Sequence, residues 1–168
     1  MDTGAWDYAA DTRGYTWGFY FQLHLTHWSF RFAVAQVPVS ANTLDMDKNV
    51  VHANAENAEI EYRYKYGDHL GKARFLSYVN HAQMGNYRQA IQSASGVNVP
   101  DITQTRSYSS KYGLGLNFEQ EVSRDLGLFS CLGWSDGSTE TRVFTEIDRS
   151  FSLGASLKGT AWRRLAWP

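Results

Sequence analysis

Two pairs of acidic residues have the residue type and the spacing for general acid–base chemistry. Glu59 and Glu61 are two positions apart, as are Glu146 and Asp148. Residues so spaced on an extended strand share a face, at about 7 Å along the backbone, and glycosidases use two carboxylates at a set separation. Nothing around either pair distinguishes it from ordinary hydrated charges, so we predict no catalytic site and no enzyme.

Metal, cofactor and nucleophile chemistry has equally little support in the sequence. A single cysteine, Cys131, excludes an internal disulfide and offers no thiolate cluster. The chain has no phosphate-binding glycine loop, no His-Glu-x-x-His motif and no nucleophile elbow. We therefore predict neither metal nor cofactor. The five histidines are scattered over expected turns and strand ends: His24, His27, His52, His69 and His81.

Composition narrows the function classes further. The formal charge is -1, with 43% apolar and 20% charged residues, so no concentrated basic surface exists for nucleic acid. No apolar run has the roughly 18 to 20 residues of a transmembrane helix. The first residues contain no basic and apolar signal segment. We expect either a cytoplasmic protein or an interior part of a longer exported one.

Strict alternation of apolar with small or polar residues is the strongest pattern in the chain. It is clearest in 15–25 and 28–37, and a period of two over this length predicts extended strands. About ten residues with aromatic ends is the length of a tilted strand that crosses a bilayer. The pattern predicts seven strands in a single domain over 1–168, near 15–25, 28–37, 56–66, 71–80, 108–122, 126–135 and 149–159.

The connections between these strands alternate in length. Short turns are expected at 26–27, 67–69 and 123–125, and long polar connections at 38–54, 81–106 and 136–148. This order predicts an antiparallel up-and-down meander with tight turns at one rim and long loops at the other, as in membrane barrels. Within the longest connection, 86–95 is expected to form a short helix or an irregular excursion.

The same period fits two kinds of barrel. In a membrane barrel the apolar face meets lipid and the polar face lines a wet lumen; in a soluble lipocalin-like barrel the aromatic residues enclose a small apolar ligand. Four charges on one face of 56–66 favour the wet lumen, because burying them unpaired costs several kcal/mol per ion. Strand parity predicts these pore-lining residues: Arg31, Glu59, Glu61, Arg63, Lys65, Arg74, Tyr78, Asn117 and Glu119.

Several strings in order along the chain resemble the carbohydrate-selective porin family of OprB type, from Gram-negative outer membranes. The strings are residues 7–18, 31–38, 133–137 and 145–154. The resemblance implies a sixteen-stranded barrel that passes mono- or oligosaccharides by diffusion, surrounded by outer-membrane lipid and without a cofactor. Seven strands are less than half of such a wall, and residues 161–168 lose the alternation. We therefore expect this chain to be an interior part of a porin.

Overall fold

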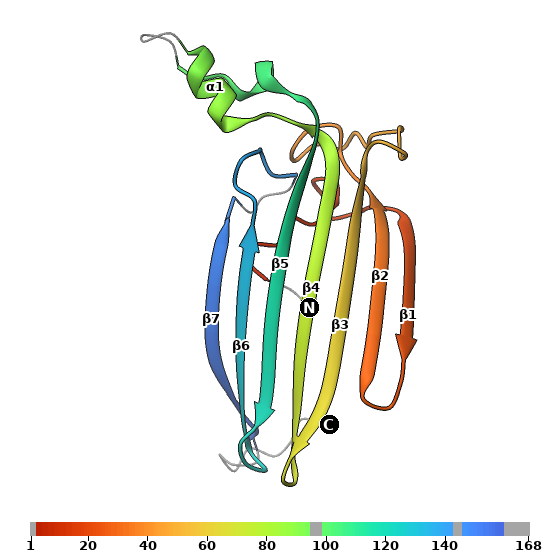
Figure 1. Ribbon diagram of the computed structural model, residues 1–168, viewed down its shortest axis with the longest axis vertical. Coiled ribbons are helices and arrows are strands. Elements are labelled where there is room, and N and C mark those ends of the chain that lie inside the picture. The colour runs from red at the N-terminus through yellow and green to blue at the C-terminus, as the bar shows by residue number, and fades with distance from the viewer. Residues whose placement is uncertain (1–2, 95–98, 143–145, 160–168) are drawn as a thin grey trace.

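Seven strands make one antiparallel sheet in which each strand pairs with the next along the chain (Figure 1). The structure, a computed structural model, describes residues 3–94, 99–142 and 146–159. The predicted all-β meander is confirmed. The strands are β1 (Gly18–His24), β2 (Trp28–Gln36), β3 (Asn54–Tyr66), β4 (His69–Met84), β5 (Ser107–Glu121), β6 (Leu126–Ser135) and β7 (Arg149–Leu157).

Strand ends differ from the expected ranges mainly in β1 and β4. The chain turns before β1, because the Asp11 carboxylate accepts hydrogen bonds from the backbone N–H groups of Arg13 and Tyr15, both at 2.9 Å, and Gly14 has a φ of 83°. β1 therefore begins at Gly18. β4 continues to Met84 because β5 pairs with it that far. Ser95, Thr145 and residues 161–168, which entered the sequence predictions, lie outside the described residues.

Short hairpins and long connections lie at opposite ends of the sheet (Figure 1). β3 and β4 are joined by two residues, with Gly67 at a φ of 60°, the backbone conformation that glycine adopts at no steric cost. Residues 37–53, 85–106 and 136–148 connect the strands at the other end. We call that end the loop rim.

The longest connection carries the helix α1 (Tyr87–Ser93) and the 3-10 turn η1 (Ile102–Thr105). Asn86 caps α1 by accepting a hydrogen bond from the Gln89 N–H at 3.0 Å. Figure 1 shows α1 beyond the strand ends, away from the sheet. Neither described helix is long and apolar enough to cross a membrane.

Close packing is concentrated where the N-terminal segment meets the sheet near the loop rim. Thr3–Asp11, which we call the strap, is not part of any strand, yet Ala5, Asp7, Ala9, Ala10 and Asp11 are buried. Ala9 packs in a small cluster with Val37, Ala53, Ala55, Ala82 and Met84. Elsewhere many large apolar side chains stay exposed, so this sheet needs an apolar environment on one side.

Candidate functional site

The strand register places all nine predicted residues on one face of the sheet, which we call the polar face. Arg31 is paired with Glu59, and Glu61 with Arg74. Asn117 continues this row on β5, opposite Arg74. Because side chains alternate across a strand and directly paired residues share a face, this register puts all nine side chains on the same side of the sheet.

Glu61 is the centre of an ion-pair network on this face. Its Oε2 accepts hydrogen bonds from Arg74 Nε at 2.8 Å and from Arg31 Nη2 at 3.3 Å. Its Oε1 accepts one from Arg63 Nη1 at 2.6 Å. Three guanidinium groups from three neighbouring strands therefore converge on a carboxylate that is only 4% exposed.

Two further carboxylates extend the network sideways. Arg31 also pairs with Glu59, and Arg74 with Glu119. Asn117 Oδ1 accepts a hydrogen bond from Arg74 Nη1 at 2.6 Å. We call the six charged residues of this network the charge ladder; its three arginines and three glutamates balance: Arg31, Arg63, Arg74, Glu59, Glu61 and Glu119.

Lys65 and Tyr78 lie on the polar face but outside the charge ladder. Lys65 is exposed close to the β3–β4 turn. Tyr78 is 2% exposed, because its ring lies over Gly113 and the strap covers it. Its ring is therefore not presented to solvent, and its hydroxyl bonds the strap instead.

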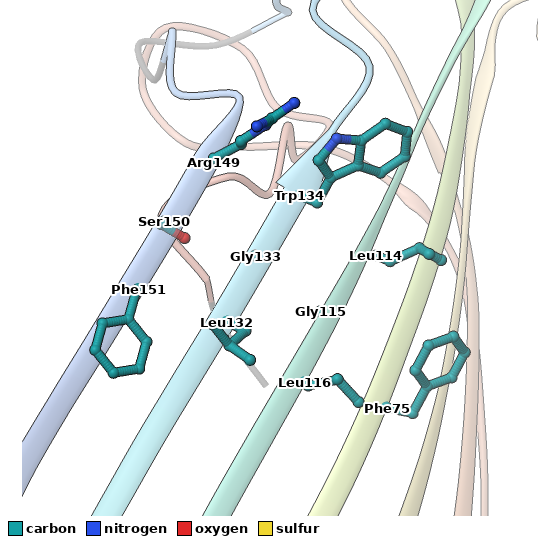
Figure 2. Close-up of a pocket in the computed structure, with 10 residues that line it drawn as sticks. All are labelled: Phe75, Leu114, Gly115, Leu116, Leu132, Gly133, Trp134, Arg149, Ser150 and Phe151. Atoms are coloured by element: carbon teal, nitrogen blue, oxygen red, sulfur yellow. The ribbon is translucent and has the colours of Figure 1, made fainter.

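The other face is apolar and exposed, and the lining side chains of a hollow on it are shown in Figure 2. Phe19, Phe32 and Leu116 are 64%, 40% and 39% exposed, and they do not meet in an enclosed interior. The hollow of about 610 Å³ among Phe75, Leu116 and their neighbours is lined mostly by apolar side chains, together with Arg149 and Ser150. An apolar surface of this extent is what lipid tails cover in a membrane barrel.

Aromatic pairs mark both ends of this apolar face. Near the hairpin end, the rings of Trp28 and Tyr62 are 4.6 Å apart, and those of Tyr62 and Tyr64 are 6.0 Å apart. Near the loop rim, the rings of Tyr112 and Trp134 are 5.6 Å apart. Rings in such bands sit at the two membrane–water interfaces of transmembrane barrels.

The strap crosses the polar face from β7 to β2. A Cβ at Gly4 would lie 3.1 Å from Ser150 Cβ on β7. In the middle Tyr78 Oη donates to the Ala5 carbonyl at 2.9 Å, and further on Trp6 Nε1 donates to Asn57 Oδ1 at 2.9 Å. Parts of the strap are visible behind the strands in Figure 1. The strap therefore covers part of the polar face.

A pocket of about 380 Å³ lies between the strap and the polar face. Its size falls within the range of small-molecule sites. Aromatic rings and hydrogen-bonding groups from both sides face it, the combination that holds a sugar by stacking and by bonds to its hydroxyl groups. The residues that carry this chemistry are Trp6, Tyr8, Tyr20, Arg31, Asn57 and Glu59.

Sequence reasoning identified Arg31 and Glu59 but missed the strap. Trp6 and Tyr8 sit in a segment without any periodic pattern, so strand parity says nothing about them. One signal was present: glycines in strand interiors often mark the close approach of another backbone. Gly133 is a strand-interior glycine on the polar face, where a Cβ would lie 2.6 Å from Ser150 Oγ on β7 and 2.7 Å from Thr3 Oγ1 of the strap.

A second set of ion pairs, centred on Glu140, connects the loops at the loop rim. Glu140 accepts a hydrogen bond from the Gly85 N–H at 2.9 Å and pairs with Arg106 and Arg142 at 2.9 and 3.0 Å. Burial alone would raise the Glu140 pKa, but hydrogen bonds from Arg106 and Gly85 outweigh it and hold that pKa below the usual value. Glu140 is therefore held as an anion.

The five histidines and the two acidic pairs are the candidate chemical groups of the sequence. No group of three or more histidine, cysteine or acidic side chains that could hold a metal ion occurs in residues 3–94, 99–142 and 146–159. Glu59 and Glu61 are both tied to Arg31, as members of the charge ladder. The charge ladder thus accounts for the position of this pair on the polar face.

These features define a class of protein: a strand wall with an exposed apolar side, aromatic bands and a charged opposite side is typical of a porin barrel. The family model described as carbohydrate-selective porin, OprB family, matches residues 2–166, and the chain belongs to this family. Porins of this family lie in the outer membrane of Gram-negative bacteria and are in general not enzymes. Neither a curated protein nor a solved structure gives a match.

Proposed function

We propose that this protein forms a passive pore for mono- or oligosaccharides in the outer membrane of a Gram-negative bacterium. Family membership supports the substrate class. The observation that carries the proposal is the pocket between the strap and the polar face, where Trp6 and Tyr8 oppose Arg31 and Glu59. No cofactor and no covalent step is needed, since solute moves down its own gradient.

The chemistry of the polar face suits weak, repeated contacts with sugars. Arginine and carboxylate groups donate and accept hydrogen bonds in planar pairs, and aromatic rings stack on the apolar faces of pyranose rings. Conduction requires binding that is strong enough to admit a solute and weak enough to release it. We propose that the pore-lining set predicted from the sequence, without the strap-covered Tyr78, provides these contacts, with Trp6, Tyr8 and Tyr20 as the stacking rings.

The two outer edges of this sheet support further strands in the wall. Among the described residues, β1 and β7 each pair on one side only. Unpaired backbone groups are not tolerated within hydrocarbon. We propose that additional strands close the barrel, as the sixteen-stranded family architecture implies.

Sugar block of ion current in planar bilayers tests the pore. The closed barrel that contains this sheet should give stable channels whose current falls as sugar is added. Trp6→Ala removes a ring from the pocket and should weaken the sugar block several-fold, the scale of an aromatic contact of about 0.5–1.5 kcal/mol. Trp28→Ala removes a ring of the same kind from the apolar face and is the matched control.

Three results would overturn the proposal, the first entirely and the other two in part. A protein that stays folded and monomeric in water without detergent, with no channel activity, would support a soluble ligand-binding barrel instead. Channels whose current is insensitive to every sugar tested would keep the pore but remove its carbohydrate selectivity. Equal sugar block in Trp6→Ala and wild type would move the sugar contact away from the strap pocket.

A further inference from the structure

Two buried side chains of β4 hold the strap by its backbone. Tyr78 Oη donates to the Ala5 carbonyl at 2.9 Å, and Asn80 Nδ2 donates to the Asp7 carbonyl at 2.5 Å. Both side chains are almost fully buried, at 2% and 1% exposure. Because the described strap has no regular secondary structure, its carbonyl groups depend on such side chains for partners.

A residue of the loop rim also binds the strap, and a glycine of the sheet leaves space for it. The Arg142 N–H donates to Asp7 Oδ1 at 2.8 Å. On β6, a Cβ at Gly133 would lie 2.6 Å from Ser150 Oγ on β7, 2.7 Å from Thr3 Oγ1 and 2.9 Å from Thr3 Cβ. The hydrogen bonds from Tyr78, Asn80 and Arg142 and the space left at Gly133 all fit the same position of the strap against the polar face.

We propose that Tyr78 and Asn80 are positioning residues that fix the strap over the polar face, so that the strap is a permanent part of the wall rather than a moving lid. That the fixed strap also sets the width of the lumen rests on the proposed function. Undocking would replace two hydrogen bonds made in a buried contact by bonds to water, and the docked state would lose their net contribution. Neither residue touches the proposed sugar pocket; each acts through the strap.

Thiol labelling measures strap docking directly, without any transport assay. Ala5, which is 2% exposed, is replaced by cysteine in a Cys131→Ser background, and the folded protein is treated with a water-soluble maleimide. With the strap seated, labelling is slow. Tyr78→Phe removes one hydroxyl and keeps the ring, so labelling should accelerate about fivefold. Asn80→Ala should do the same, and the double variant should give the larger effect.

Matched controls separate strap release from general loosening. Tyr66→Phe makes the identical change at a side chain that is 78% exposed, and should leave the labelling rate unchanged. Gly133→Ala places a methyl group against Thr3 of the strap and Ser150 of β7, whereas Gly127→Ala, on the same face of the same strand, meets its nearest neighbouring atom only at 3.9 Å. Gly133→Ala should accelerate labelling and Gly127→Ala should not.

The failure of this inference differs from the failure of the proposed function. Rapid labelling in the wild type, or equal rates in wild type and Tyr78→Phe/Asn80→Ala, would show that β4 does not hold the strap. Slow labelling together with channels whose current does not respond to sugar would support the fixed strap and contradict the proposed sugar pore. If the double variant labels fast while single-channel current and sugar block stay at wild-type values, the strap does not set the lumen width.

Discussion

Replacing Glu61 by glutamine removes the central anion of the charge ladder while keeping the size and shape of the side chain. Glu61 accepts hydrogen bonds from Arg31, Arg63 and Arg74. The variant leaves three arginines with two glutamates, so the ladder changes from neutral to one positive charge in excess. Both the stability of the wall and the sign of its field should respond.

The size of the effect follows from burial. Removing one partner from a buried ion pair costs about 3–5 kcal/mol, whereas exposed pairs contribute at most about 1 kcal/mol. The three guanidinium side chains are 23%, 29% and 15% exposed, so water reaches them in part. We therefore expect Glu61→Gln to lower the free energy of unfolding by about 2–3 kcal/mol, between these limits.

Two measurements on the same variant check this reasoning. Urea unfolding in lipid or detergent micelles should show the loss of stability. The reversal potential under a salt gradient should shift towards anion selectivity, because the lumen gains a positive field. Glu121→Gln is the control: this exposed carboxylate accepts one hydrogen bond from the Leu70 N–H at 3.1 Å and lies outside the ladder, so both readouts should change far less.

An unchanged unfolding midpoint in Glu61→Gln would refute the structural part of this reasoning. An unchanged reversal potential in a variant that is clearly destabilised would show that the charge ladder is not exposed to the permeating ions. Equal effects in Glu61→Gln and Glu121→Gln would remove the special role of the central position.

Three further predictions address the strap, the loop rim and the lipid face. Burial raises the pKa of Asp7 from its ordinary value of 3.8, with Lys111 offsetting only part of it. Strap docking should therefore be strongest below pH 3.8 and weaken as pH rises through the raised pKa; proteolysis of the strap should follow pH in the wild type but not in Asp7→Asn. The Glu140 pKa is lowered, so the loop rim should resist proteolysis above pH 4.5 and lose this resistance as pH falls through the lowered value, a dependence that Glu140→Gln should abolish. Phe75→Arg on the apolar face should cost about 2–4 kcal/mol in lipid-embedded unfolding, and a loss below 0.5 kcal/mol would contradict the lipid-facing assignment of that side.

The sequence alone determined the strand wall, because period-two alternation is a local property that survives in any sheet with two different faces. It separated Arg31, Glu61 and Arg74 from Phe32, Ile60 and Phe75 before any pairing was known. It also fixed the order of short turns and long loops.

Only the tertiary structure decided what lies against the polar face. The strap has no period to read, and its position depends on partners far along the chain, such as Tyr78 and Asn80 for the carbonyl groups of Ala5 and Asp7. Parity correctly placed Tyr78 on the polar face but could not show that the strap covers it. Strand alternation depends on residues that are neighbours in the sequence. The position of an irregular segment depends on long-range contacts, which exist only after the sheet has formed.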